Sequence, residues 1–569
     1  MPVCLFRLAA ACLALAGCAT ASSQPPLIAA PPATGLVSAA DPRAAEAGAE
    51  VLRAGGSAAD AAFATLIALT VVEPQSSGIG GGGFLVYSGG GRLPDSYDGR
   101  EEAPMAARGD WFFVNGQPLP TAEAIPGGRS VGVPGNMRMM ALAHRDHGKL
   151  AWARLFDPAI RLARDGFAIT PRLFRALDKY RTTGALSPAA RDLFYGPDGS
   201  PKAVGTVVRN SAIATALEGF AVRGPDSFYV GPNAAAIAAA VSGAARNPAP
   251  MSVGDLVAYD AKKRPPVCGD YRGYRVCGMG PPSSGATTVV AILKQLERFD
   301  LAALGPNSPV AWHLIAESTR LAFADRDRYL ADSDHVAVPV AGLIDPAYLA
   351  RRSALISSER TMAAVIAGTP AGAPRVVAGL EPVEAGTSHF VAVDRAGNVA
   401  SLTSTIESPF GSGLMVNGFY LNNELTDFSL APTGATGPVA NRVEGGKRPR
   451  SSMAPTIVYG RDGRVRLAVG AAGGATIIAQ VARAIIGVID WRLSAQDALA
   501  LPVIFAPGNT IFVERGTVLE TMIPALRALG HGKIGYREPT SFKANAIEST
   551  DGRWMGAADP RSEGVAVAE

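Results

Sequence analysis

Two short runs in which apolar and polar residues alternate predict a β-hairpin over residues 388–405. The first run, SHFVAV, and the second, VASLTST, are separated by a segment that contains Gly397-Asn398. Period-two alternation on both sides of a glycine-containing turn is typical of two antiparallel strands. Thr387 stands at the head of the first strand, directly after Gly386. Judged by residue type alone, it is an ordinary β-branched strand residue.

Helical patterns precede this hairpin. Asp41 and Pro42 introduce an alanine-rich run and have the N-cap and first-turn positions typical of a helix start. Ser57 opens a second helix with a capping-box pattern, and this helix is apolar through Val72. The segment 312–332 predicts a long amphipathic helix that packs on the core.

A glycine run at 78–83, GIGGGG, formally contains the G-x-G-x-x-G pattern of dinucleotide sites. That pattern must follow a strand and open a helix, whereas this run follows a helix and precedes the strand-like FLVYSG. Histidines, cysteines and acids show no metal-ligand spacing either. We therefore expect neither a cofactor nor a structural metal.

Length and charge narrow the class further. The chain has 569 residues, of which 48% are hydrophobic, so it can bury a core larger than that of one ordinary domain. Basic residues number 53 and acidic residues 49, giving a net charge of +4. No lysine- or arginine-rich run stands out, and we expect no nucleic-acid partner.

The first residues have the pattern of an export signal. Residues 1–18 carry Arg7 and then an apolar core too short to span a bilayer. The closing LAGC resembles a bacterial lipoprotein box, which implies cleavage before Cys18 and its lipidation; a plain secretory signal is the alternative. Ala19 implies, by the same resemblance, an outer-membrane anchor on the periplasmic side. Residues 19–32, rich in Ser, Pro and Ala, predict a flexible tether.

Cys268 and Cys277 are the cysteines outside this segment. If Arg272-Gly273 is a two-residue hairpin loop, counting outward sets the two cysteines opposite each other, where strands approach closely. An exported protein meets an oxidising compartment, so a disulfide is one interpretation. Two small buried thiols are the other.

Several motifs together resemble one family. T-S-H-F at Thr387, then Gly397-Asn398, T-S-T-I-E and Phe410-Gly411, resemble the small-subunit signature of γ-glutamyltranspeptidases. GSAADAAFA, VVEPQSSGIGGGGF and the final DPRSEGVAVA resemble other parts of the same family. The resemblance implies an α/β fold, a four-layer αββα sandwich of the N-terminal nucleophile hydrolase type. It also implies a precursor cut into a large subunit, 33–386, and a small catalytic subunit, 387–569.

The resemblance assigns the chemistry to Thr387. Cleavage after Gly386 would leave its α-amine within reach of its hydroxyl, as general base for a nucleophilic threonine. Thr405 would hydrogen-bond the nucleophile, and Gly473 and Gly474 would offer N–H groups to the oxyanion. By residue type alone, Thr405 is a strand residue and the glycine pair a turn.

The resemblance also assigns the substrate contacts. Arg100, in YDGREEAP, would bind an α-carboxylate through its planar guanidinium. The other assigned residues are Ser451 and Ser452 for the carboxylate, and Glu407, Glu424 and Asp427 for the ammonium. A surface arginine and solvated acids are the alternatives by residue type. Two features depart from the family: Glu407 stands where many members have Asn, and the lid region 428–450 contains no Tyr or Trp.

These assignments predict an autoprocessing γ-glutamyltransferase or glutathione hydrolase. Its donor would be glutathione or another γ-glutamyl compound, and its acceptor water, an amino acid or a dipeptide. Its partner in the processed enzyme would be its own other subunit, and it would reach the membrane by the lipid anchor only. A related acylase acting on β-lactam side chains or poly-γ-glutamate is one alternative, and an uncleaved lipoprotein that only binds is another.

Overall fold

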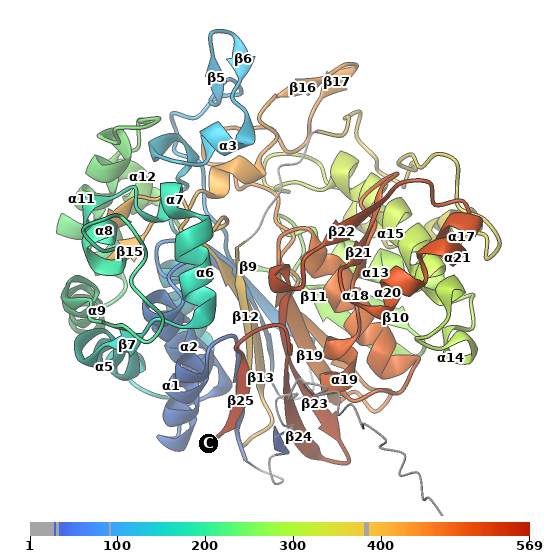
Figure 1. The fold of residues 1–569 in the computed structure, drawn as a ribbon, viewed down its shortest axis with the longest axis horizontal. Helices are drawn as coiled ribbons and strands as arrows, with labels where there is room; N and C mark the ends of the chain where they lie inside the picture. The colour runs from blue at the N-terminus through green and yellow to red at the C-terminus, as the bar shows by residue number, and fades with distance from the viewer. Residues whose placement is uncertain (1–27, 30–33, 90–92, 380–385) are drawn as a thin grey trace, which may run out of the picture.

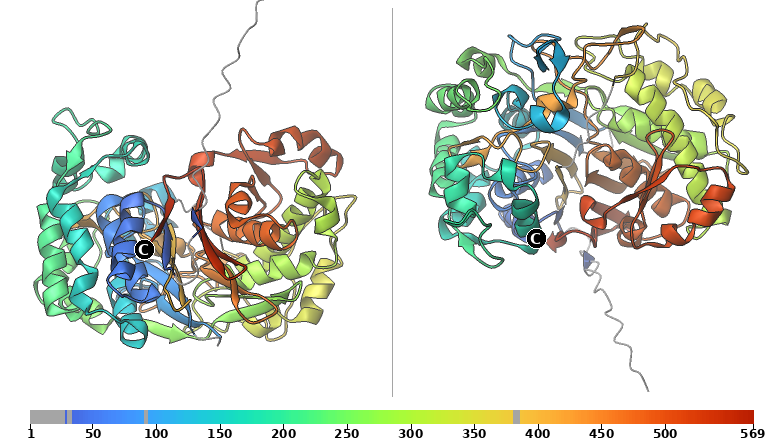
Figure 2. Two further views of the ribbon diagram at one scale, coloured as in Figure 1. Left: turned by 90° about the horizontal axis from the view of Figure 1, so that it is seen from below. Right: turned by 45° about the horizontal axis from the view of Figure 1, so that its top comes forward.

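The computed structural model describes residues 28–29, 34–89, 93–379 and 386–569. Two seven-stranded sheets pack face to face, and helices cover their outer faces (Figures 1 and 2). This arrangement confirms the predicted α/β class. The predicted signal segment, Cys18 and nearly all of the tether lie outside the described residues. Within the described ranges, no helix has the length and apolar character needed to cross a bilayer.

The first sheet is antiparallel throughout and holds the predicted hairpin at its centre. Its order is β25 (Val565–Ala568), β2 (Leu36–Ala39), β12 (Ser388–Val393), β13 (Val399–Thr405), β3 (Gly82–Ser88), β4 (Asp95–Gly99) and β9 (Lys262–Arg264). The hairpin is confirmed: β12 pairs with β13, from Ser388 opposite Ser404 to Val393 opposite Val399. Helices α1 (Pro42–Arg53) and α2 (Ala58–Val72) cover the outer face of this sheet.

The second sheet is also antiparallel. Its order is β1 (Ile28–Ala29), β24 (Arg553–Ala558), β23 (Lys543–Thr550), β19 (Val465–Ala472), β18 (Thr456–Tyr459), β11 (Tyr274–Gly278) and β10 (Val267–Tyr271). Helices α13 (Gly285–Leu296) and α18 (Thr476–Ile489) cover it. Cys268 lies opposite Cys277 in the β10–β11 hairpin, and a disulfide joins them.

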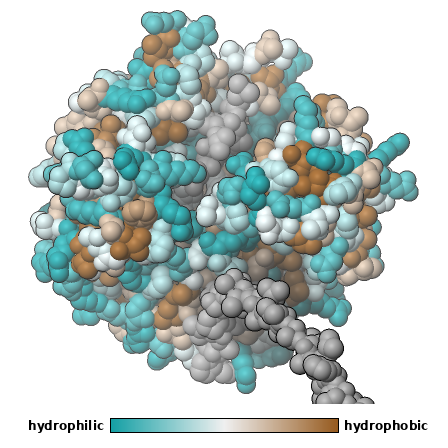
Figure 3. Space-filling view, in the orientation of Figure 1, coloured by the Kyte–Doolittle hydropathy of each residue, from teal (hydrophilic) through white to brown (hydrophobic). Residues whose placement is uncertain are grey.

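Further helices extend the two outer layers. Beyond the first sheet lie α4 (Asn136–His147), α5 (Asp157–Asp165), α6 (Pro171–Lys179), α8 (Pro188–Phe194), α9 (Ser211–Arg223), α11 (Pro232–Ser242) and α12 (Val253–Ala258). Beyond the second lie α15 (Pro309–Tyr329), α17 (Pro346–Ser353), α19 (Ala495–Ala500), α21 (Ile523–Ala528) and the small sheet of β20 (Ile504–Phe505), β21 (Ile511–Glu514) and β22 (Ile534–Arg537). Hydrophilic and hydrophobic residues are interspersed over the face that Figure 3 shows.

The helix starts predicted from sequence are confirmed. The Asp41 side chain accepts a hydrogen bond from the Arg43 amide, and Ser57 forms a reciprocal capping box with Asp60. The predicted long helix is α15, and it packs on the core as expected, with some of its charged residues buried as well. Glu317 and Arg320 are buried and form an ion pair of 2.5 Å. Packing on both sides explains this, since α15 lies between α13 and the small sheet.

The segments predicted to become two subunits interleave in both sheets. In the first sheet, β12 and β13 lie between β2 and β3, which come from the other segment. In the second, β10 and β11 continue the sheet from β18. A cut between residues 386 and 387 would therefore leave two chains that share both sheets and the core between them. The predicted subunit boundary itself stays a prediction.

The interface between the sheets is closely packed at His389. A Cβ atom on Gly470 would lie 2.4 Å from the His389 imidazole, so glycine is needed for this approach. The imidazole Nδ1 is 2.8 Å from the Thr403 hydroxyl. Burial lowers the pKa of His389 to about 3, so the ring is neutral at pH 7.

Candidate active site

Thr387 lies at the entry to β12, with only 6% of its surface exposed. Its amide donates to the Ser76 carbonyl at 3.0 Å, and its hydroxyl donates to that of Thr405 at 3.1 Å. The backbone has φ = 109°, which non-glycine residues rarely adopt. Such a conformation costs about 1–3 kcal/mol and persists only where the surroundings impose it. The strain lies at the predicted cleavage point.

Gly386 is fixed by close packing. A Cβ atom at this position would lie 1.8 Å from the Glu407 carbonyl oxygen, so no larger residue fits without a backbone shift. Glycine is therefore required by the packing of this segment.

Thr405 connects Thr387 to the backbone of Glu407. It ends β13, and its hydroxyl also accepts a 2.8 Å hydrogen bond from the Glu407 amide. Glu407 has φ = 73°, and the Asn423 side-chain amide donates to its carboxylate. Burial, followed by the charge of Asp427, raises the pKa of Glu407 to about 8.

Arg100 follows β4 and lies fully enclosed. Its two terminal nitrogens form ion pairs with Glu424 and Asp427, respectively. These acids begin and end one 3-10 turn, which sets positions i and i+3 on the same side. Arg100 Nε also donates to the Pro449 carbonyl at 3.1 Å, and Nη2 donates to that of Arg450 at 3.0 Å. The surface positions expected from residue type alone are therefore wrong for all three charged residues.

The site holds more acid than base. Glu101 lies 4.0 Å from Arg100, and burial raises the pKa of Glu101 to about 8. Burial also raises the pKa of Glu424 well above its ordinary value, although Arg100 opposes the shift. Enclosed carboxyl groups with too few cations bind protons instead. An arriving ammonium would supply the missing positive charge.

Ser451 and Ser452 lie beside this cluster and are tied to other groups. The Ser452 hydroxyl accepts from Arg326 Nη2 at 2.6 Å, and the Ser451 hydroxyl accepts from the Met453 amide at 3.1 Å. Their connection to Arg100 runs through the neighbouring carbonyl of Arg450. The structure thus places the serine pair next to the predicted carboxylate site.

Gly473 and Gly474 form the turn between β19 and α18, with φ of 117° and 60°. Glycine adopts such angles readily, and the turn immediately precedes the start of α18. Gly473 and Gly386 line the same cavity, of about 360 Å³. We refer to it as the Gly386 cavity. Gly473, the predicted oxyanion residue, and Gly386, at the predicted cleavage point, therefore line the same cavity.

Three residues of the site went unassigned from sequence. They are Ser76, Glu101 and Asn423. Each lies inside a family motif or next to a residue that the family resemblance assigned. This position in the sequence was the only sign that it could belong to the site. Their roles depend on contacts between distant segments, since Ser76 meets Thr387 across more than 300 residues of chain.

One histidine and acid group resembles a metal site. His313, Glu317 and His531 bring their ligand atoms within 4.8 Å of one another. Their contacts already account for this grouping: the histidines hydrogen-bond each other at 2.7 Å, and Glu317 accepts from Arg320, Thr361 and the Met362 amide. We assign no metal to it.

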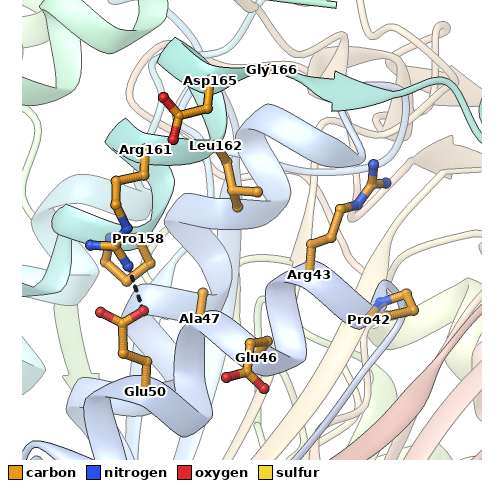
Figure 4. Close-up of a pocket in the computed structure, with 10 residues that line it drawn as sticks. All are labelled: Pro42, Arg43, Glu46, Ala47, Glu50, Pro158, Arg161, Leu162, Asp165 and Gly166. Carbon is orange, nitrogen blue, oxygen red and sulfur yellow. Dashed lines mark hydrogen bonds and ion pairs between the residues drawn. The ribbon is translucent and has the colours of Figure 1, made fainter. Parts of the chain in front are cut away.

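A separate pocket of about 430 Å³ lies between α1 and α5 (Figure 4). Its walls mix apolar residues with charged ones, and an ion pair joins Glu50 and Arg161 across it. None of the site residues predicted above lines this pocket. This pocket is therefore separate from the residues around Thr387.

The fold is that of α/β enzymes of the acylase and transpeptidase kind. The structure of cephalosporin acylase from Bacillus halodurans is similar over 98% of this chain and 99% of its own, with a TM-score of 0.85 and 27% identity. γ-Glutamyltranspeptidase from Helicobacter pylori is 34% identical, with a TM-score of 0.54, over 57% of this chain and 91% of its own.

The sequence comparisons identify the family. The Gamma-glutamyltranspeptidase family model matches residues 44–569, and the chain belongs to this family. Glutathione hydrolase proenzyme from Bacillus subtilis (strain 168) is 36% identical over 94% of this chain and 91% of its own. Glutathione hydrolase proenzyme from Escherichia coli (strain K12) is 33% identical over 99% of this chain and 98% of its own. Acylase ACY 1 proenzyme from Pseudomonas sp. (strain V22) is 35% identical over 94% of both chains. Similarity at this level does not separate hydrolase from acylase.

Proposed function

We propose that the protein is an autoprocessing γ-glutamyltransferase and glutathione hydrolase of the N-terminal nucleophile hydrolase type. One observation carries the proposal: Thr405 joins the Thr387 hydroxyl to the backbone of Glu407, beside the enclosed Arg100, Glu424 and Asp427 cluster. A nucleophile thus lies beside a site that matches a zwitterionic α-carbon.

Self-cleavage comes first. The Thr387 hydroxyl attacks the Gly386 carbonyl, the peptide C–N bond breaks, and the acyl group passes to oxygen as an ester. Water then hydrolyses the ester, leaving a carboxylate on Gly386 and a free amine on Thr387. The strained φ of Thr387 favours this step, because cleavage removes the constraint on that residue.

The donor then replaces the ion pairs that Arg100 forms with Glu424 and Asp427 inside the protein. Its α-carboxylate pairs with the Arg100 guanidinium, and its α-ammonium pairs with Glu424 and Asp427. The freed Thr387 amine takes the hydroxyl proton, and the oxygen attacks the γ-carbonyl to form an acyl-enzyme. Gly473 and Gly474 offer amide groups to the developing oxyanion, a contribution worth about 3–4 kcal/mol in comparable sites. Water or an amine acceptor resolves the ester.

An acylase acting on other donors is the second candidate. The lid region 428–450 has no Tyr or Trp to close over a small donor. Glu407 stands where many family members have Asn, so the contacts offered to the donor differ at this position. The open lid favours larger donors, such as β-lactam side chains or poly-γ-glutamate.

We also propose that the protein is exported and anchored by a lipid on Cys18. The LAGC motif supports the anchor, and the Cys268–Cys277 disulfide supports an oxidising compartment. Labelled palmitate should enter the wild-type chain in bacterial cells. Incorporation that persists in a Cys18→Ser variant would refute the anchor.

The deciding experiment is to express the mature chain and determine the N-terminus of any small fragment. We expect a fragment that begins Thr-Ser-His-Phe and is absent from Thr387→Ala. Release of nitroaniline from a γ-glutamyl anilide would then establish the donor class, and activity only on other acyl amides would favour the acylase. A wild-type chain that stays intact would overturn both in favour of a binding protein.

A further inference from the structure

A buried ion pair lies close to Thr387. Lys543 begins β23, Glu73 is the C-cap of α2, and both side chains are enclosed. The Lys543 ammonium lies 2.7 Å from a Glu73 carboxylate oxygen. Lysine is almost never fully buried unless it is paired. A buried pair is weak evidence for stability, since well-packed apolar residues of similar size often serve a core as well or better.

Both members of the pair contact the residues that hold Thr387 in place. Glu73 accepts a 2.6 Å hydrogen bond from the hydroxyl of Ser388, the next residue after Thr387, and Lys543 donates to the same hydroxyl at 3.1 Å. Lys543 also donates to the Ser76 hydroxyl at 3.4 Å, and the Ser76 carbonyl accepts from the Thr387 amide at 3.0 Å. The ammonium thus contacts both the residue that follows Thr387 and the residue that holds its nitrogen.

Positive charge prevails around this pair. Arg172, on α6, lies 3.8 Å from the Glu73 carboxylate, so two cations share one acid. Although burial opposes the shift, the charges of Lys543 and Arg172 lower the pKa of Glu73. Burial lowers the pKa of Lys543 to about 8, and the charge of Glu73 opposes that shift. Glu73 is therefore ionised and Lys543 largely protonated at pH 7. Among the described lining residues of the Gly386 cavity, those that carry charge are all basic: Arg172, Arg175, Lys179 and Arg537.

The nearby acids do not cancel this charge. Asp41 acts on Lys543, but it is paired with Arg43 at 2.5 Å. Burial raises the pKa of Glu407 to about 8, so its carboxyl is mostly neutral at pH 7. The other acids of the site lie within ion-pair distance of Arg100 and are Glu101, Glu424 and Asp427.

The Thr387 nitrogen changes its chemistry on cleavage. In the uncut chain it is an amide without charge, and after cleavage it is an α-amine, whose ordinary pKa is about 7.7–8.0. Only the unprotonated amine can take the hydroxyl proton as the threonine oxygen attacks the donor carbonyl. A nearby cation disfavours the protonated amine and therefore lowers its pKa.

We propose that Lys543 is a positioning residue that keeps the freed Thr387 amine unprotonated and in place, and that Glu73 limits this effect. The inference rests on the proposed function of Thr387 as nucleophile. Lys543 acts on the amine by its charge and fixes it through Ser76 and Ser388. The amine can then receive the hydroxyl proton at neutral pH, which the acyl transfer requires.

The test measures kcat/KM for γ-glutamyl-4-nitroanilide against pH with fully processed enzyme. The low-pH limb of this profile reports the base of the free enzyme. Lys543→Met removes the charge and keeps a long side chain, so the amine pKa should rise and the limb should move to higher pH by about one unit. Glu73→Gln removes the opposing charge and should move the limb to lower pH. In Glu73→Gln/Lys543→Met the limb should return close to that of the wild type.

Matched variants separate charge from packing. Lys543→Arg keeps the positive charge and should keep the wild-type limb. Lys533→Met removes an exposed lysine and should leave both the limb and the activity unchanged. Because Glu407 titrates in a similar range, the two substitutions are repeated in Glu407→Gln, where the opposite shifts should persist.

A second measurement does not depend on turnover. Cyanate reacts with unprotonated amines, so its rate of reaction with the small-subunit N-terminus against pH, read by mass spectrometry, gives the pKa of the Thr387 amine. This pKa should rise in Lys543→Met and fall in Glu73→Gln.

Other outcomes would overturn the role of Lys543. Lower activity with an unshifted limb, or shifts of the same sign in Lys543→Met and Glu73→Gln, would show that the pair only supports the fold. If Lys543→Met stays uncut, Glu73→Gln decides, since an unshifted limb and amine pKa there would exclude the charge effect. Failure of the proposed function would look different, because the wild type would then stay uncut or release no nitroaniline at any pH.

Discussion

The hydroxyl of Thr405 has two partners whose loss can be measured separately. It accepts from the Glu407 amide at 2.8 Å and lies 3.1 Å from the Thr387 hydroxyl. Thr405→Val keeps the shape of the side chain and removes both contacts. We expect slower self-cleavage and a less stable loop, because the nucleophile loses its orientation and a buried amide loses its acceptor.

The magnitude follows from those two bonds. A neutral hydrogen bond contributes about 0.5–1.5 kcal/mol net, and an amide left buried and unpaired costs about 1–3 kcal/mol. Since about 1.4 kcal/mol is tenfold in rate, losing the bond to Thr387 should slow cleavage by about twofold to tenfold. The cost of leaving the Glu407 amide unpaired is measured by adding Thr405→Val to the Thr387→Ala variant, which cannot cleave itself. The added Thr405→Val substitution should lower the free energy of unfolding by about 1–3 kcal/mol.

The assays are gel analysis of small-subunit appearance with time and urea unfolding of the uncleaved variants. Thr405→Ser keeps the oxygen and should cleave close to the wild-type rate. Thr403→Val removes a buried hydroxyl from the same strand, 2.8 Å from His389, and should lower stability without slowing cleavage. Wild-type cleavage by Thr405→Val, or equal slowing by Thr403→Val, would refute the role assigned to Thr405.

Three further predictions follow from single contacts. Gly386→Ala should lower the free energy of unfolding by about 1–3 kcal/mol and slow cleavage, because its Cβ atom would lie 1.8 Å from the Glu407 carbonyl oxygen. The control is Gly508→Ala, whose added Cβ would meet nothing within 4 Å. Equal effects of the two substitutions in gel and unfolding assays would contradict this reasoning. In urea unfolding, Cys268→Ser/Cys277→Ser should have a free energy of unfolding about 2–3 kcal/mol lower than that of the oxidised wild type. The reduced wild type should be as stable as the variant. An oxidised wild type no more stable than the variant would rule out a stabilising disulfide. The unfolded pKa of His389 is 6.5 and the folded pKa about 3, so the unfolded chain binds the extra proton and stability should fall as pH drops through that window. His389→Gln should show a shallower acid slope, and an unchanged slope would exclude His389 as its source.

Local patterns were sufficient for the central hairpin and the first two helices of this protein. The hairpin over 388–405 and the two helices that begin after Asp41 and Ser57 appear where alternation and capping residues predicted them. Such signals act over a few residues, so the sequence displays them directly. The hairpin register also set Cys268 opposite Cys277, although counting residues left open whether the thiols were joined.

The site depended on distances that no local pattern contains. Residue type favoured exposed positions for Arg100, Glu424 and Asp427, and only the folded chain shows them enclosed together. The family motifs named them, but motifs do not say that the guanidinium pairs with the acids before a substrate arrives. The Gly386 cavity had no motif of its own, because the lining residues on α6 and Arg537 are far apart in sequence.

The sequence by itself determined the central hairpin, the starts of the first two helices and the family, since period, capping and motif spacing are properties of neighbouring residues. Tertiary structure alone decided which carboxyl groups are buried, at which positions only glycine fits, and which charged residues lie next to one another. Burial and electrostatics depend on everything within a few ångströms, and those neighbours come from segments hundreds of residues apart.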